Sequence, residues 1–159
     1  MERTTHHVTT VSDSCLVATT PRTLWSESLE SPLEVTVVFT DTRSSLNALK
    51  TAALLAGGLN ARVRLVVPQV VSYELPLNEP PIPTDFIEQQ IAHLVSDLNV
   101  ETRVDICLCR NKKESLLRAL RPHSVTVVGS RRRWWPTWER RLARELRRAG
   151  HEVIFTETE

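Results

Sequence analysis

Short β-branched runs alternate with helical patterns from residue 34 to residue 157, and this alternation limits the folds open to the chain. Strands that alternate with helices require right-handed crossover connections, which place the strands parallel in one sheet. The crossover helices then cover both faces of that sheet. The sequence therefore predicts an α/β fold with a five-stranded, mostly parallel open sheet and helices on both faces.

The expected elements follow from these runs and from their capping residues. The five predicted strands are EVTVVFT, ARVRLVVPQVV, VETRVDICLC, SVTVVGS and HEVIFTE. Apolar residues at helical spacing predict four helices, which begin at Ser44 or Ser45, at Thr84, at Asn111 and at Pro136. We expect Gly57 and Gly58 to end the first helix and Gly150 to end the last.

The strand order also follows from the pattern. The two most apolar strands, Val35–Phe39 and Val125–Val128, are expected at the centre of the sheet because both of their faces are apolar. A chain that winds outward from the first strand and returns to its other side reverses the strand order between them. Open α/β sheets bind ligands at such a reversal, beyond the carboxyl ends of the strands. We expect Asp41 and Gly129–Ser130 to face each other there.

The domain organisation is simple. A chain of 159 residues is long enough for one core but short for two domains. Residues 1–33 are rich in Thr and Ser, and we expect an N-terminal extension that is partly disordered or loosely packed, with a short strand near Thr10–Ala18. Residues 34–159 are expected to form the one α/β domain.

Composition and residue spacing exclude several classes of function. A net charge of +1 gives no general attraction to nucleic acid or to a membrane, and no apolar run approaches the roughly 20 residues of a membrane span. Three cysteines, an odd number, argue against a disulfide framework and for the cytoplasm. No metal-ligand spacing, Ser–His–Asp set or carboxylate pair is present. We therefore expect no metal, no membrane contact and no enzyme.

Three segments, in this order, resemble the universal stress protein family: VVFTDTRSSLNALKTAALLA, VETRVDICLCRNKKESLLRAL and VTVVGSRRR. The resemblance covers residues 34–157. It implies the Rossmann-like fold that this family shares with the adenine nucleotide alpha hydrolases, and a role in stress response or regulation. It also implies a homodimer through the last strand, with Val153, Ile154 and Phe155 at the interface.

Many members of that family bind ATP through a glycine-rich loop after the fourth strand, and this chain departs from the pattern. The three glycine positions fall on Gly129, Arg132 and Leu142, and the final Ser or Thr falls on Ala143. Glycine lets backbone amides wrap around phosphate, whereas the Arg132 side chain would fill that space. We therefore expect a degenerate nucleotide site without the usual ATP binding. The resemblance places the site at Asp41, Val67, Gly129, Ser130, Arg131 and Arg132.

Several alternatives stay open at this point. Arg131–Arg133 could bind phosphate through their side chains, which would make the chain an ATP- or AMP-binding protein and possibly a slow ATPase. The Arg/Trp segment 131–148 could instead bind nucleic acid, although the net charge disfavours it. Trp134 and Trp135 are better placed to cover the crevice or to contact a partner protein. Asp41 is equally suited to contacting a ribose or to capping a helix.

The remaining expectations concern the core and the edge of the sheet. Trp138 is expected in the core beside Leu142, because both lie on one face of the predicted helix. Cys107 and Cys109 should share one buried face of their strand. The last strand, Glu152–Thr156, is expected at a sheet edge, where Val153 and Phe155 point to one side and Ile154 to the other.

Overall fold

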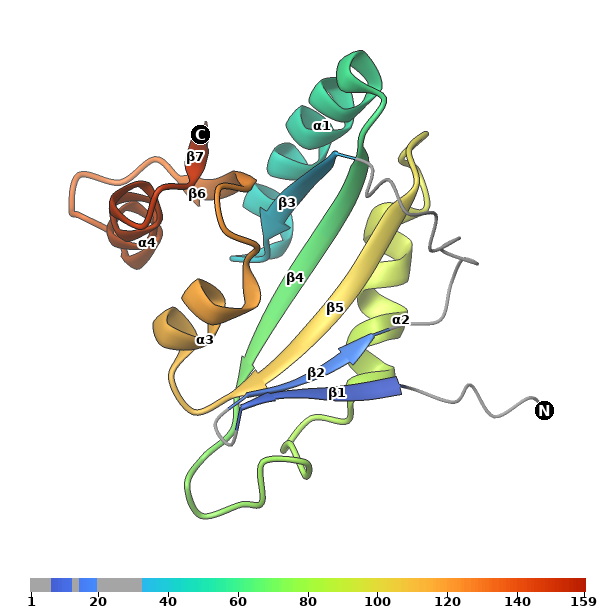
Figure 1. Ribbon diagram of the computed structural model, residues 1–159, viewed down its shortest axis with the longest axis vertical. Coiled ribbons are helices and arrows are strands. Elements are labelled where there is room, and N and C mark those ends of the chain that lie inside the picture. The colour runs from blue at the N-terminus through green and yellow to red at the C-terminus, as the bar shows by residue number, and fades with distance from the viewer. Residues whose placement is uncertain (1–6, 13–14, 20–32) are drawn as a thin grey trace.

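The computed structural model describes residues 7–12, 15–19 and 33–159, which form one sheet flanked by helices (Figure 1). The strands are β1 (His7–Ser12), β2 (Cys15–Thr19), β3 (Glu34–Val38), β4 (Arg62–Val70), β5 (Thr102–Cys109), β6 (Val125–Arg131) and β7 (Glu152–Thr158). The helices are α1 (Thr42–Leu59), α2 (Thr84–Val95), α3 (Lys112–Ala119) and α4 (Trp138–Arg148).

The strand order is β1-β2-β5-β4-β3-β6-β7, and the five strands from β3 to β7 are all parallel to one another. The predicted five-stranded parallel sheet is therefore confirmed. The two most apolar strands, β3 and β6, are neighbours at the point where the order reverses, as expected. The last strand, β7, lies at one edge of the sheet, as expected.

The N-terminal segment adds two strands to this sheet. β1 and β2 form an antiparallel pair, and β2 pairs antiparallel with β5, with Cys15 opposite Cys109 and Thr19 opposite Asp105. Two strands thus stand where the sequence suggested one short strand. Residues 1–6, 13–14 and 20–32, to which the rest of that prediction refers, lie outside the described residues.

Helices cover both faces of the sheet. On one face, α1 packs Ala48, Leu49 and Ala52 against alternate side chains of the central strands, including Val37 and Val127. On the other face, buried side chains of α3 and α4 pack against the intervening strand positions; this second core contains Leu116, Leu142, Leu146, Val38, Val66 and Val128. Because successive side chains of a strand point to opposite faces, each central strand supplies both cores.

The prediction that Cys107 and Cys109 share a buried face of their strand is confirmed. Cys107 and Cys109 are buried in the second core, while Leu108 between them belongs to the first. The side chain of Cys15 is not among those described.

The helix ends differ in part from the prediction. Asp41, and not Ser44 or Ser45, caps α1, and both serines are buried inside its first turns. Gly57 and Gly58 do not end the helix, which continues to Leu59 and stops at Asn60 with a left-handed backbone (φ 50°). Asparagine tolerates this conformation better than most residues, and it therefore replaces glycine as the terminator.

The other helices show the same mixture of confirmed and wrong assignments. Asn111 caps α3 as predicted, since its side chain accepts hydrogen bonds from the amides of Lys113 and Glu114. Thr84 is the first residue of α2 and makes no capping hydrogen bond. Helix α4 begins two residues after Pro136 and is capped by the Thr137 hydroxyl.

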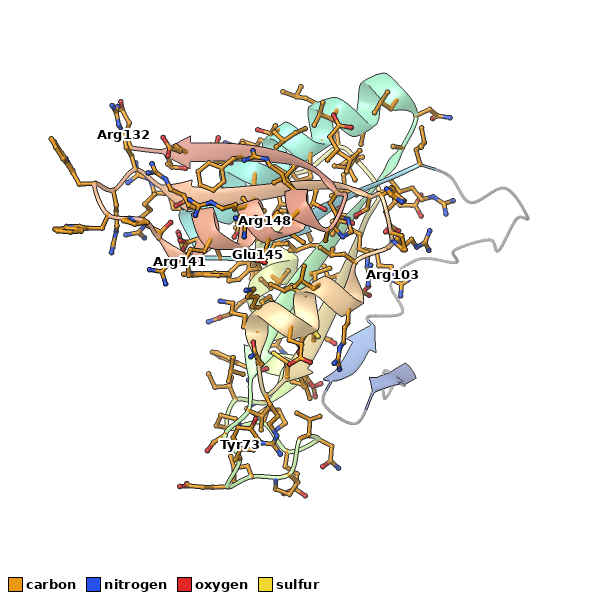
Figure 2. All side chains as sticks on the ribbon, turned by 60° about the vertical axis from the view of Figure 1, so that its left-hand side comes forward. Tyr73, Arg103, Arg132, Arg141, Glu145 and Arg148 are labelled. Atoms are coloured by element: carbon orange, nitrogen blue, oxygen red, sulfur yellow. The ribbon has the colours of Figure 1, made fainter. Side chains whose placement is uncertain are left out.

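The proline-rich connection between β4 and α2 is an irregular loop, as the sequence suggested, and it lies at the end of the molecule where Tyr73 is labelled in Figure 2. The Arg110 guanidinium organises its first half. It donates hydrogen bonds to the carbonyl groups of Val71, Ser72 and Leu75, and its Cζ lies 5.1 Å from the centre of the Tyr73 ring. A single side chain thus ties this loop to the end of β5.

A buried carboxylate lies beneath α3. Asp105 in β5 is fully buried, and its two oxygens accept hydrogen bonds from Arg64 Nε at 2.6 Å and from Arg103 Nε at 2.9 Å. Arg64 also donates to the carbonyl of Ala119 at the end of α3. The charge cluster therefore ties β4, β5 and α3 together. Removing the carboxylate would take away the buried acceptor that the Arg64 and Arg103 guanidinium groups share.

We therefore expect Asp105→Ala to lower the free energy of unfolding by about 3–5 kcal/mol. Glu114→Ala is the matched control, because it removes a carboxylate from the exposed Glu114–Arg118 pair of α3. It should cost less than about 1 kcal/mol. Urea denaturation followed by circular dichroism measures both values, and equal effects would show that the buried cluster has no special weight.

Candidate functional site

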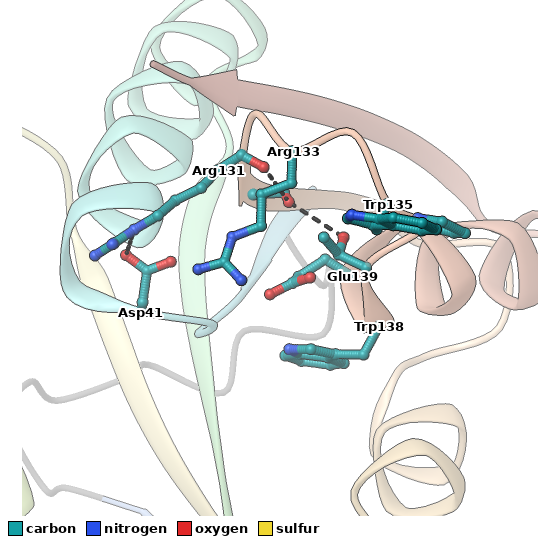
Figure 3. A pocket seen from close by; sticks show the side chains of 9 residues that line it. Asp41, Arg131, Arg133, Trp135, Trp138 and Glu139 are labelled. Atoms are coloured by element: carbon teal, nitrogen blue, oxygen red, sulfur yellow. Dashed lines mark hydrogen bonds and ion pairs between the residues drawn. The ribbon is translucent and has the colours of Figure 1, made fainter.

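A hollow of about 490 Å³ opens beyond the carboxyl ends of β3 and β6, where the strand order reverses (Figure 3). We call it the switch-point crevice. It is lined by Asp41, Ser130, Arg131, Arg133, Trp135, Pro136, Thr137, Trp138 and Glu139. Asp41 and Ser130 do face the same space, as the sequence predicted. Arg131 also lines the crevice.

Asp41 is held at the start of α1. Its Oδ1 accepts hydrogen bonds from the amides of Arg43 and Ser44, both at 3.1 Å, and lies 3.6 Å from Arg131 Nε. Burial opposes ionisation of Asp41, but the hydrogen bonds from Ser44, the Arg131 charge and the Arg43 amide outweigh it and lower the pKa of the carboxyl. The capping interpretation of Asp41 is thus confirmed, and its contact with a ribose stays a prediction.

Gly129 does not line the crevice, because it lies beneath α1. A Cβ atom on this residue would lie 2.2 Å from the backbone oxygen of Ser44, far closer than a real contact allows. Its own carbonyl accepts a hydrogen bond from the Thr40 hydroxyl at 2.8 Å. The glycine therefore makes room for the backbone of α1.

The other positions of the phosphate-loop pattern lie elsewhere too. Leu142 and Ala143 are buried on the inner face of α4. Arg132, which we expected to fill the phosphate space, is not among the residues that line the crevice. Its amide donates to the carbonyl of Thr158, and its side chain lines a separate hollow beside the end of β7 (Figure 2). Arg132 comes directly after the last residue of β6, and it lines this other hollow whereas Arg131 lines the crevice.

Val67, the expected adenine contact, is almost fully buried in the first core and is not among the lining residues of the crevice. Its side chain packs within the sheet–helix layer formed by α1 and α2.

The tryptophans are more exposed than predicted. Trp138 is not a core residue: it is 36% exposed and lines the crevice, with Lys112 Nζ 3.8 Å from the centre of its ring. Burial lowers the pKa of Lys112, while the charges of Glu139 and Cys109 act in the opposite direction. Trp135 lies at the crevice, as expected, whereas Trp134 is fully exposed and lies outside it.

The sequence interpretation did not assign Glu139 to the crevice, and it considered Arg133 only in the arginine-based alternative. Figure 3 shows the guanidinium of Arg133 directed into the hollow, with the carboxylate of Glu139 next to it. The Oε2 atom of Glu139 is buried and has no hydrogen-bond partner among the described residues. The signal that could have identified Glu139 is its place in the first turn of α4, directly after the Trp-Pro-Thr-Trp segment.

Cys109 is the last residue of β5, just before the connection to α3. Hydrogen bonding with Cys107 is the largest influence on Cys109; with Ser115 and the Lys112 charge it outweighs burial and lowers the pKa of the thiol to about 7. Both cysteines are fully buried, so neither sulfur is accessible to a reagent in the folded protein. Among the described residues, no group of three or more His, Cys, Asp or Glu side chains could hold a metal ion.

Several arginines of α4 are engaged within the chain. Arg140 pairs with Glu157 of β7, and Arg147 donates to the carbonyl of Val153 at 3.1 Å. Glu145 lies 3.6 Å from both Arg148 and Lys113. Figure 2 shows Arg141, Glu145 and Arg148 along α4. Much of the positive charge of α4 therefore takes part in contacts with neighbouring parts of the chain.

Comparison of the sequence with protein-family profiles and with curated proteins finds no match. Among solved structures, a protein of the universal stress protein family from Burkholderia pseudomallei is similar, with a TM-score of 0.55 and 20% sequence identity. The match covers 79% of this chain and 96% of the other. The chain thus has the α/β fold of that protein. In the described ranges, no helix is long and apolar enough to cross a membrane.

The close contact at Gly129 leads to a prediction about the stability of the protein. Gly129→Ala should lower the free energy of unfolding by more than about 2 kcal/mol, because the backbone of α1 must move to admit the methyl group. Gly57→Ala is the matched control: a Cβ there meets nothing within 4 Å, and alanine should stabilise the helix by about 0.5–1 kcal/mol. Chemical denaturation of both variants is the measurement, and a neutral Gly129→Ala would contradict the packing argument.

Proposed function

We propose that this chain is a cytoplasmic, universal-stress-protein-like binding module with a role in stress response or regulation, and that it acts through binding and not through catalysis. The switch-point crevice is its binding site. The fold supports the type of protein, and the place of the crevice at the reversal of the strand order supports the site.

We further propose that the crevice does not hold ATP in the manner usual for that family. The observation that carries this proposal is the close contact of Gly129 with the backbone of Ser44. A backbone packed this tightly against a helix cannot also wrap around phosphate oxygens. Arg131 is already paired with Asp41, and Leu142 belongs to the core. The elements of a triphosphate cradle are thus used for packing.

A second candidate function is nucleotide binding through arginine side chains, which the positions of Arg131 and Arg133 on the crevice favour. Guanidinium groups bind phosphate through charge-assisted hydrogen bonds and need no glycine loop. In that case Arg131→Ala should weaken ATP or AMP binding by about 10-fold or more, since such contacts contribute about 1.5–3 kcal/mol. Arg132→Ala, outside the crevice, should have no effect.

Isothermal titration with ATP and with AMP separates the two candidates. We expect no saturable heat, corresponding to a Kd above about 1 mM for either nucleotide. Micromolar ATP binding would overturn the degenerate-site proposal. If that binding were also lost in Arg131→Ala but kept in Arg132→Ala, the arginine-based alternative would replace it.

We also propose a homodimer through β7. This strand lies at the sheet edge, where unpaired backbone groups can pair with a second copy. Val153 and Phe155 pack against one core and Ile154 against the other, so all three are partly buried already. A partner strand would cover the remainder of their surface on both faces at once.

Sedimentation equilibrium should therefore give a species of twice the 18.1 kDa chain mass. Hydrogen exchange of the β7 amides should slow as the protein concentration rises, whereas exchange at β1, the opposite edge, should not change. A monomer throughout the concentration range, or concentration-dependent protection confined to β1, would contradict the proposed interface.

A second proposed contact surface, for a macromolecular partner, surrounds Trp134. Its side chain is fully exposed beside Arg132 and Arg133. Tryptophan and arginine are enriched at the centres of protein interfaces, and we propose a protein partner here. Nucleic-acid binding has weaker support, because Arg140, Arg147 and Arg148 of this segment already make contacts within the chain.

A further inference from the structure

The crevice has an aromatic end that the phosphate-loop argument does not explain. Trp135 is 80% exposed and Trp138 is 36% exposed, so two large apolar surfaces meet solvent at one hollow. Figure 3 shows both indoles nearly edge-on, with Trp135 above the level of the Glu139 carboxylate and Trp138 below it. Exposed indole faces stack readily on planar heteroaromatic rings. This end of the crevice suits a planar ring.

The Glu139 carboxylate determines which hydrogen-bonding groups such a ring must carry. Its Oε2 atom is buried without a hydrogen-bond partner in the part of the chain that the structure describes. A carboxylate can only accept hydrogen bonds, and a buried acceptor is normally satisfied. Two oxygens on one carbon fit a ligand with two adjacent N–H donors. The ring should therefore present a donor edge.

Positive charge lies on the other side of Glu139. The Arg133 guanidinium is directed into the crevice between Glu139 and the Asp41–Arg131 pair (Figure 3). Within the described ranges Arg133 makes no ion pair, whereas Arg131 is paired with Asp41. A guanidinium without a carboxylate partner is suited to an anionic group. From one end to the other, the crevice thus presents indole faces for stacking, a carboxylate with two acceptor oxygens, and a guanidinium cation.

We propose that the switch-point crevice binds a guanine mononucleotide: the base stacks on Trp135 and Trp138, its N1–H and N2–H groups donate to Glu139, and its 5′-phosphate contacts Arg133. Guanine presents two adjacent donors on its Watson–Crick edge. Adenine presents an acceptor, N1, beside its amino group, and that lone pair would face the carboxylate. A volume of about 490 Å³ suits a ligand of this size.

This inference rests on the proposed function to the extent that the chain is taken as a binding module. It differs in the ligand and in the residues. The base lies at the first turn of α4, far in sequence from Val67, and a single phosphate needs one guanidinium and no glycine loop.

The test is titration of the full chain with GMP, IMP and AMP. IMP keeps N1–H and lacks the N2 amine, so it should bind about 10-fold or more weakly than GMP through loss of one charge-assisted hydrogen bond. AMP should give no saturable binding. AMP as tight as GMP would overturn the proposal, because stacking alone would then explain the affinity.

Variants assign the contacts. Glu139→Gln should weaken GMP binding about 10-fold or more and remove the preference of GMP over IMP. Trp135→Ala, at an exposed position where folding is not at stake, should also weaken GMP binding at least several-fold. Trp134→Ala is its matched control outside the crevice and should leave binding unchanged.

The outcomes separate this inference from the proposed function. Absence of GMP binding, or GMP binding unchanged by both Glu139→Gln and Trp135→Ala, would overturn the guanine site and leave the degenerate-site proposal intact. Micromolar ATP binding would overturn the degenerate-site proposal. If GMP still bound more tightly than AMP and needed Glu139, the guanine site would stand.

Discussion

The close approach of α1 to β6 determines how the rest of the molecule is arranged. The Ser44 carbonyl lies where the Cβ of any residue other than glycine would be at position 129. This contact sets the first turn of α1 directly on the central strand, where its residues Ser44 and Ser45 are buried. Asp41 is thereby fixed at the end of β3, opposite Arg131. One wall of the crevice is thus a consequence of helix packing.

The crevice is polarised along its length. At the β3 side, the charges neutralise each other, because Asp41 is engaged by two amides and by Arg131. At the α4 side, the Oε2 atom of Glu139 has no hydrogen-bond partner and Arg133 makes no ion pair within the described residues, and two indoles are exposed. The charged groups at the strand ends are therefore paired, whereas the polar groups that lack partners among the described residues lie at the start of α4. A ligand of the crevice should therefore be complementary to the charged groups and the indoles at the start of α4.

The parallel sheet could be predicted from the sequence because its strands are buried on both faces. Runs such as Val35–Phe39 and Val125–Val128 are apolar throughout, and few other structures accommodate them. The strand order followed from the same observation. In the N-terminal segment only one short strand was predicted where the structure has two, since a Thr- and Ser-rich segment carries no such signal and the pairing of β2 depends on the edge of β5.

The site was predicted less well, and for local reasons. Serine is small enough to be buried inside α1, so the capping role passed to Asp41, which precedes the helix. A Cβ atom at Gly57 or Gly58 would meet nothing within 4 Å, so no packing contact requires glycine there. Each glycine costs the helix only the free energy of its low helix propensity, and it need not end the helix. Trp138 lies on the apolar side of α4, but as its first residue it meets the crevice instead of the sheet. Whether Gly129, Ser130, Arg131 or Arg132 contacts a ligand stays a prediction.

The placement of the tryptophans has a practical consequence. All three whose side chains are described, Trp134, Trp135 and Trp138, lie in one short segment at the surface, and neither core in the described part of the chain contains one. Trp134 and Trp135 are already exposed in the folded protein, so their ultraviolet emission should change little when the two cores unfold. The emission of Trp135 and Trp138, which line the crevice, should respond to a molecule bound there, so these two side chains can serve as an optical reporter of binding.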